Sequence, residues 1–121
     1  MTYIDWRSSN PTEINEVDRA ISAWRMISRK PTPITLNRRD GTVVASQNVR
    51  IEYEQRQIER QGMLTTSERN KVTVFGVRNH PLVDDTDIQE GDEFVYQQST
   101  YVVMSLSWYS GEVQALCEQR N

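Results

Sequence analysis

The sequence has very little of the chemistry on which most enzymes and metal proteins depend. Its 121 residues include one cysteine, Cys117, and one histidine, His80. A single cysteine cannot form an intrachain disulfide, and a single histidine excludes a metal site built from several histidines of one chain. The five glycines are scattered, so there is no glycine-rich phosphate-binding loop. We therefore expect no catalytic residues, no metal or cofactor site and no enzymatic activity.

Long apolar runs and a strong excess of basic charge are also missing. No stretch approaches the roughly 20 apolar residues that a membrane-spanning helix requires. The net charge is −3, whereas a protein that mainly grips a phosphate backbone needs a concentrated basic face. The lone cysteine and the lack of a recognisable signal peptide lead us to expect a free thiol and assembly in a reducing cytoplasm.

The clearest local signal is for one helix over residues 11–29. Asn10 is a suitable N-cap and Pro11 suits the first helical position, while acidic residues come early and basic residues late, as the helix dipole favours. Pro31 and Pro33 end the helix. Apolar residues recur at spacings of three and four, which predicts one buried stripe. The stripe consists of Ile14, Val17, Ile21, Trp24 and Ile27.

After the helix the apolar pattern alternates, which indicates strands. A turn signal at Asp40 and Gly41 separates the first two, and short connections at residues 98–99 and 110–111 separate the last three. One helix followed by about six strands in hairpin order predicts an α+β fold, with the helix packed on a small antiparallel β-barrel. The expected strands are residues 34–36, 42–45, 49–53, 71–78, 92–97, 100–108 and 112–119.

The organisation along the chain is simple. Residues 1–10 form an N-terminal arm, and residues 11–121 form a single domain of ordinary size. In that domain we place the helix at 11–30 and the barrel at 34–119, interrupted by one long loop at 55–70. The loop is polar and nearly free of core residues. Connections of this length are uncommon in compact domains and are usually functional or disordered.

Three features that resemble chemical sites have simpler explanations. His80 lies in an expected loop, where an exposed or locally hydrogen-bonded side chain is the default. Cys117 alternates with apolar neighbours near the end of a strand, which is typical of a small buried thiol. The acidic segment 84–93 does not have calcium-loop spacing, because Gly91 falls at the wrong position. We expect it to be a solvated turn, or a patch complementary to a basic neighbour.

The C-terminal third contains a recognisable succession of a turn and strands. Residues 88–92 read Ile-Gln-Glu-Gly-Asp before a strand, a Tyr-Val-Val segment follows at 101–103, and an apolar strand ends near Cys117. This arrangement resembles the ending of head-closure and head–tail joining proteins of long-tailed bacteriophages. The order of the whole chain is similar too: an N-terminal helix, two strands, a long polar loop and further strands.

The resemblance implies a structural role in the neck of a virion. Such proteins form a ring below the portal and its adaptor, where they retain packaged double-stranded DNA and provide a docking surface for the tail. We therefore expect the partners to be further copies of the chain, the portal or adaptor above, a tail-tube or tail-terminator protein below, and DNA in the channel. The expected location is the virion, after assembly in the host cytoplasm. No cofactor and no membrane are implied.

The resemblance also implies roles for particular segments. In that family the loop between the second and third strands projects into the channel and helps to close it, and the matching segment here is the long polar loop. We expect the arm, the helix and the acidic turn to contact neighbouring subunits or partners. The expected gating residues are Gln55, Arg56, Gln57, Glu59, Arg60, Gln61, Thr65, Ser67, Glu68 and Arg69, and the expected interface residues are Tyr3, Trp6, Arg25, Arg29, Asp84, Asp85 and Asp87.

Two alternative functions stay open. A tail-terminator or tail-completion ring protein has a similar small α+β domain and stops tail growth. A small single-stranded nucleic-acid-binding barrel would interleave arginines with aromatic residues on one face. Most of the aromatic residues fall at positions expected to be core, and acidic residues are mixed among the arginines, so we favour head closure. The candidates for such a face are Arg38, Arg39, Arg50, Arg78, Tyr53, Phe75, Tyr101, Trp108 and Tyr109.

Overall fold

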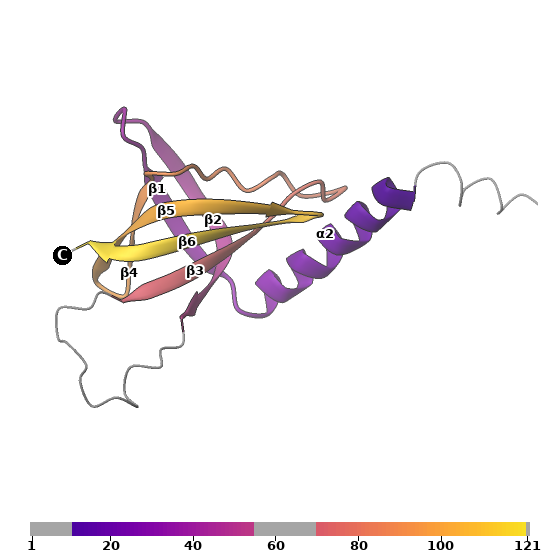
Figure 1. Ribbon diagram of the computed structural model, residues 1–121, viewed down its shortest axis with the longest axis horizontal. Helices are drawn as coiled ribbons and strands as arrows, with labels where there is room; N and C mark the ends of the chain where they lie inside the picture. Colours follow the sequence, from indigo (N-terminus) through magenta and orange to yellow (C-terminus); the bar gives the residue numbers. More distant parts are fainter. Residues whose placement is uncertain (1–10, 55–69, 121) are drawn as a thin grey trace, which may run out of the picture.

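The computed structural model describes residues 11–54 and 70–120 and shows one helix followed by six strands (Figure 1). The helix predicted over residues 11–29 is confirmed. No helix in this part of the chain is long and apolar enough to cross a membrane. The elements are α2 (Pro11–Arg29), β1 (Thr32–Asn37), β2 (Val43–Tyr53), β3 (Lys71–Val77), β4 (Glu93–Tyr96), β5 (Ser99–Tyr109) and β6 (Glu112–Arg120).

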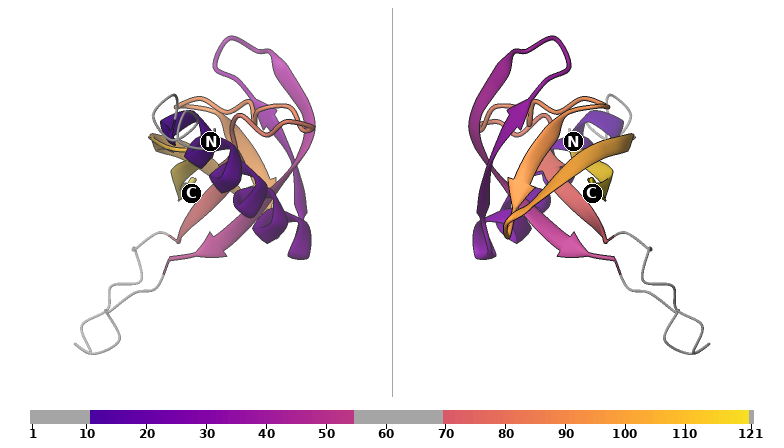
Figure 2. Two further views of the ribbon diagram at one scale, coloured as in Figure 1. Left: turned by 90° about the vertical axis from the view of Figure 1, so that its right-hand side faces the viewer. Right: turned by 90° about the vertical axis from the view of Figure 1, so that its left-hand side faces the viewer.

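The six strands form one closed antiparallel barrel in the order β1-β2-β3-β6-β5-β4 (Figures 1 and 2). The predicted fold class, a helix packed on a small antiparallel barrel, is confirmed. The barrel closes at a short seam, because the described pairing of β1 with β4 consists of Asn37 opposite Glu93. All other neighbouring strands pair over four residues or more.

β2 is one long strand, whereas the sequence predicted two segments, 42–45 and 49–53. Its first half pairs with β1 and its second half with β3, so the strand passes from one neighbour to the other. Residues 46–48 are polar and mostly exposed, which breaks the apolar alternation without breaking the strand. The side-chain pattern therefore predicts two strands, whereas the backbone pairing makes residues 43–53 one strand.

The β4–β5 turn also lies one residue earlier than expected. Tyr96 pairs with Ser99, and the turn consists of Gln97 and Gln98, whose φ angles are 51° and 72°. Two successive residues with positive φ are characteristic of the tight hairpin turns that match the strand twist. Glutamine rarely adopts this conformation, so its side chain did not signal the turn.

Side chains from all six strands fill the interior of the barrel. The buried residues alternate along each strand with exposed ones, as in other small barrels with packed cores. The rings of Phe94 and Tyr101 stack with centroids 5.7 Å apart. The core consists of Ile34, Leu36, Val49, Ile51, Val72, Val74, Ile88, Phe94, Tyr101, Val103, Val113, Ala115 and Cys117.

α2 packs on the outside of the barrel, against β3, β2 and β6 (Figure 1). Its deepest residues are Ala20, Ala23 and Ile27, which form a second apolar cluster with Val77. Of the predicted stripe, Ile27 is buried here and Trp24 packs against the cluster, whereas Val17 is 37% exposed. Small alanines allow the helix backbone to come close to the sheet, and this packing overrides the larger apolar residues of the sequence pattern.

Gly111 provides the closest approach between the helix and the barrel. It lies in the β5–β6 turn with φ of 76°, and a Cβ there would be 2.7 Å from the backbone oxygen of Glu16. Gly41 also has a positive φ, of 91°, but a Cβ there would meet nothing within 4 Å. Substitutions at the two glycines can therefore distinguish the free-energy cost of backbone strain, present at both, from the cost of displacing the helix, present only at Gly111.

We predict that Gly111→Ala destabilises the protein more than Gly41→Ala. The control should lose about 1–2 kcal/mol, the usual cost of a left-handed conformation for a residue with a Cβ. Gly111→Ala should lose about 1–3 kcal/mol more, because α2 must shift away from the sheet. Urea unfolding followed by circular dichroism measures both values. Equal losses would contradict this account of how α2 is seated.

Candidate functional site

The outward-pointing side chains of β3, β6 and β5 form a continuous surface, which we call the outer face. The strand register aligns Thr73, Leu116 and Ser105 in one row across it. The register of β5 shifts between Val103 and Ser105, where Met104 lies. Met104 is 52% exposed and Leu116 is 45% exposed. Two large apolar side chains therefore lie together on the surface, which is typical of a contact site when they belong to a wider patch.

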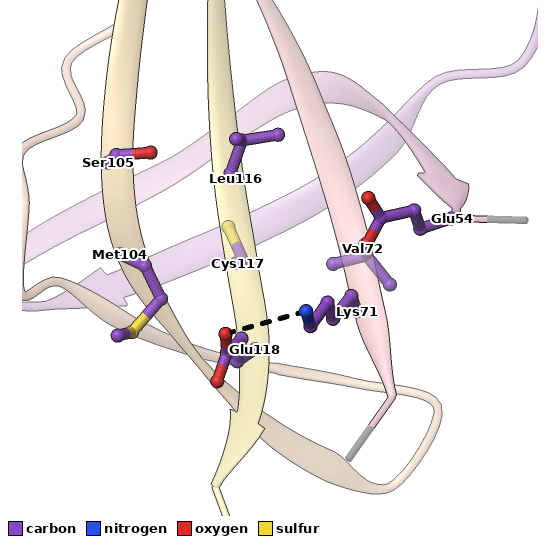
Figure 3. A pocket seen from close by; sticks show the side chains of 8 residues that line it. All are labelled: Glu54, Lys71, Val72, Met104, Ser105, Leu116, Cys117 and Glu118. Atoms are coloured by element: carbon purple, nitrogen blue, oxygen red, sulfur yellow. Dashed lines mark ion pairs between the residues drawn. The ribbon is translucent and has the colours of Figure 1, made fainter. Parts of the chain in front are cut away.

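The outer face is hollowed at two places. The first hollow, of about 200 Å³, lies between β3, β6 and the shifted part of β5 (Figure 3). Met104 from β5, Leu116 and Glu118 from β6 and Lys71 from β3 contribute to its lining. The second hollow, of about 400 Å³, lies where α2 meets the sheet, and Met26, Phe75 and Tyr109 contribute to its lining. Both hollows are open and mixed in character, which suits side chains of another protein better than a small reactant.

The charges beside the first hollow contribute little to folding. Lys71 Nζ and Glu118 Oε2 are 4.0 Å apart, and both side chains are at least one-third exposed (Figure 3). Exposed pairs of this kind contribute about 0–1 kcal/mol. Arg50 Nε lies 2.8 Å from Glu52 Oε2, and Arg50 Nη1 donates to the backbone oxygen of Met26 at 3.2 Å. Arg50 thus joins β2 to α2 and has a structural role. The Lys71–Glu118 pair, by contrast, is accessible to a partner.

Cys117 lies beneath the first hollow but does not offer a reactive thiol. Its side chain points into the barrel and is 1% exposed, and its Sγ is 3.6 Å from the carbonyl oxygen of Ala115. Burial raises the pKa of the thiol to about 12, because the apolar core disfavours the thiolate. Since the thiolate is the nucleophile, Cys117 has a packing role, in agreement with the sequence-based expectation.

The acidic segment between β3 and β4 divides into a buried and an exposed part. Asp92 is 1% exposed, and its carboxylate accepts a hydrogen bond of 2.8 Å from the backbone N–H of Gln89. Arg38 Nε lies 3.3 Å from Asp92 Oδ1, and Arg38 Nη2 lies 2.5 Å from Asp87 Oδ1. Gly91 has φ of 90° and donates its N–H to the carbonyl oxygen of Val103. The Gly-Asp motif therefore builds the turn that begins β4.

The expected interface residues that can be located are exposed and lie on two separate elements. Arg25 and Arg29 are on α2, and Asp84, Asp85 and Asp87 are on the β3–β4 connection. Asp87 pairs with Arg38, and Asp85 Oδ1 accepts a hydrogen bond from the backbone N–H of Asn79. The expected gating residues, at positions 55–69, lie outside the described residues, as do Tyr3 and Trp6.

Sequence reasoning missed the outer face. Leu116 was available as a signal, because it is an apolar residue at an outward position between the inward-facing Ala115 and Cys117. Met104 was not, because its exposure follows from the register shift in β5, which depends on the pairing with β6. Local patterns do not predict such shifts.

The residues considered for single-stranded nucleic acid do not share one face. Tyr101 is in the core, and Arg78 lies 4.6 Å from the ring centroid of Trp108 at the opposite end of β5. Arg38 and Arg50 are paired with carboxylates. In the part of the chain that the structure describes, no group of three or more histidine, cysteine, aspartate or glutamate side chains is placed to hold a metal ion.

No protein-family model matches the chain, and no curated protein matches it.

We predict that Cys117 is protected from thiol reagents in the folded protein. A pKa near 12, against an ordinary 9.0, corresponds to a thiolate fraction about a thousandfold smaller at pH 8. Reaction with an aromatic disulfide reagent should be slow in buffer and fast in urea. Because the folded pKa is raised, the associated stability is fully present below pH 9 and is lost as the pH rises towards 12. Cys117→Ala should show a shallower loss of stability over that range, and a native thiol that reacts as fast as the unfolded one would contradict the burial.

Proposed function

We propose that the chain is a ring-forming structural subunit of the neck of a tailed bacteriophage, where it closes the head after DNA packaging and offers a docking surface to the tail. The observation that carries this proposal is the outer face. Its exposed apolar residues, Met104, Leu116 and Tyr109, are arranged over two strands on a barrel whose interior is already filled. A surface of this kind fits a protein that acts through contacts with other subunits.

The order of the elements supports the same proposal. A helix, two strands, a long connection and four further strands is the succession that the resemblance to head-closure proteins implies, and the strands close into the expected barrel. The long connection leaves the barrel between Glu54 and Asn70. Those two ends are held together, since Glu54 N–H donates to the carbonyl oxygen of Lys71 at 2.9 Å. The strands on either side of the connection, β2 and β3, are thus hydrogen-bonded to each other where the connection begins and ends.

A ring also requires that two different surfaces of each subunit meet around the axis. The exposed Arg25 and Arg29 on α2 and the exposed carboxylates on the β3–β4 connection are two such surfaces, of opposite charge. Under this proposal the partners are further copies of the chain, a portal or adaptor above, a tail-tube or tail-terminator protein below and DNA in the channel. The proposed location is the virion neck. A tail-terminator protein also forms a ring and also needs two different contact surfaces, so tail termination is the second candidate function.

We expect a phage with a nonsense mutation in this gene to produce heads without tails, empty of DNA, beside free tails of normal length. The reason is that an unclosed head loses its DNA and has no tail-docking surface. Electron microscopy of the lysate makes the measurement, with complementation from a plasmid as the control. Filled heads beside tails of uncontrolled length would assign the chain to tail termination and overturn head closure.

We also predict that Leu116→Asp combined with Met104→Asp blocks assembly without unfolding the barrel. Both side chains are exposed, so the melting temperature should change by only about 2–4 °C, the shift that corresponds to a surface effect well under 1 kcal/mol. The contact with a neighbouring protein would have to bury two carboxylates, which should weaken it at least about tenfold. Complementation titre and sedimentation velocity measure these effects.

Val95→Asp is the matched control for this pair. Val95 is 63% exposed on β4, outside the outer face, and the substitution places the same side chain on the surface, with one negative charge instead of two. It should complement normally. Normal titres from the Leu116 and Met104 variant would show that the outer face is not a contact surface.

A further inference from the structure

Leu82 is the most exposed of the large apolar side chains that the structure describes, at 89%. It lies in the β3–β4 connection, next to Val83, which packs against the apolar cluster beneath α2. A single exposed leucine is ordinary on a protein surface. This one differs in two respects, because its backbone is held in place and because exposed carboxylates follow it, at Asp84 and Asp85.

Hydrogen bonds within the β3–β4 connection fix the backbone that carries Leu82. The N–H of Leu82 donates to His80 Nδ1 at 2.9 Å. The N–H of Asn79 donates to Asp85 Oδ1 at 2.8 Å, which closes the segment on either side of the leucine. The rings of His80 and Trp24 meet edge-on with centroids 6.4 Å apart, which joins the connection to α2. A side chain presented by such a backbone requires little further ordering when a partner covers it.

The second hollow of the outer face offers a site of complementary character. Phe75 and Tyr109 line it from the sheet, and Arg19, Ser22 and Met26 line it from α2. Its volume of about 400 Å³ has room for a leucine side chain and part of the backbone that carries it. The lining is thus apolar where the sheet forms it and includes a cation where the helix forms it.

The charges around the second hollow favour an acidic partner. Arg19 is exposed, and so is Arg29, which lies seven residues after Ser22 and therefore on the same face of α2. Glu112 also lines the hollow, where its Oε2 accepts a hydrogen bond from Gln114 Nε2 at 3.0 Å. The wall that the helix forms therefore places exposed arginines beside an apolar hollow.

The first hollow is less suited to the same segment. Among its described lining residues, the carboxylates of Glu54 and Glu118 are accompanied by one amine, that of Lys71. Asp84 is exposed two residues after the leucine, so the segment would be repelled there. Charge complementarity thus distinguishes between the two hollows of the outer face.

We propose that Leu82 of one copy of this chain inserts into the second hollow of the next copy, with Asp84 beside the arginines of α2. The two surfaces lie on different sides of the helix: Trp24 packs against the β3–β4 connection, whereas Met26 lines the hollow. Two positions along an α-helix are about 200° apart around its axis. Each copy can therefore donate its leucine to one neighbour and accept a leucine from another, as a closed ring requires. The inference rests on the proposed function in one respect, since it presupposes that copies of the chain associate.

Leu82→Asp tests the inserted side chain. Leu82 is exposed and its hydrogen bond is made by the backbone, so the variant should fold like the wild type. Its self-association in sedimentation velocity should be at least about tenfold weaker, because the hollow would have to bury a carboxylate. Val95→Asp, the same side chain at an exposed position of β4, is the matched control and should associate like the wild type. A Leu82→Asp chain that associates as tightly as the wild type would overturn the contact, as would a wild-type chain that stays monomeric at millimolar concentration.

Ser22→Glu tests the hollow that accepts the leucine. Ser22 is exposed on α2, and glutamate there partly fills the hollow and adds a negative charge where the acidic segment should bind. The loss of self-association should match that of Leu82→Asp. Ser28→Glu is the matched control, since Ser28 is exposed on the same helix and does not line the hollow. Equal behaviour of the two serine variants would contradict the assignment of the hollow.

A mixture of the two defective chains distinguishes this contact from a symmetric one. The Leu82→Asp chain keeps its hollow, and the Ser22→Glu chain keeps its leucine. An equimolar mixture should therefore form a heterodimer and no larger species, although each chain alone is monomeric. A mixture in which both chains stay monomeric would overturn the proposed insertion.

The failure of this inference is distinguishable from the failure of the proposed function. A Leu82→Asp chain that associates normally and complements the mutant phage would overturn the leucine contact and leave head closure intact. Formation of the mixed dimer by a chain whose loss leaves the phage heads filled would support the contact and overturn head closure.

Discussion

The contact between Arg38 and Asp92 is the constraint on which the barrel depends. Arg38 follows directly after β1 and Asp92 comes directly before β4, so the ion pair joins the two strands at the seam where their described pairing is a single residue pair. The buried carboxylate has a second hydrogen bond, from Gln89 N–H, and the guanidinium has a second partner in Asp87. A buried charge with incomplete partners is costly, so these four groups favour one arrangement of the seam over others. The ion pair thus reinforces the seam that the backbone pairing of Asn37 with Glu93 closes.

Closure determines which surfaces of the barrel are exposed. Side chains from all six strands fill the interior of the closed barrel, and the surfaces described above lie on its outside. α2 covers part of that outside, and the small residues Ala20 and Gly111 allow it to lie close to the sheet. The remainder stays exposed as the outer face. The same seating of α2 places Trp24 and Val77 in the lining of a further hollow area, which residues 44–48 of β2 and residues 83–87 also line. One helix position thus creates both surfaces.

The fold could be predicted from the sequence where the signals are local. Pro11 and the prolines after Lys30 mark the helix, and alternation marks the strands, because each depends on residues within a few positions. The buried side of α2 could be predicted only in part: Ile27 of the apolar stripe is buried, but the position of Ala20 depends on the distant Gly111 rather than on hydrophobicity. For the candidate site, Leu116 was visible as an outward apolar residue, whereas Met104 depends on a register shift that only pairing produces. The roles predicted for residues 55–69 stay predictions.

Two unlike surfaces on one small domain have a consequence for assembly. If copies of the chain associate as proposed, the exposed arginines of α2 on one copy meet the exposed carboxylates of the β3–β4 connection on the next, so the contact is heterologous. Such contacts generate a ring when the rotation closes and an open filament when it does not. Contacts between exposed charged side chains are weak and permit some rotation between the two copies. The angle must then be set elsewhere. The outer face, rigid and held by three paired strands, is the surface suited to set it.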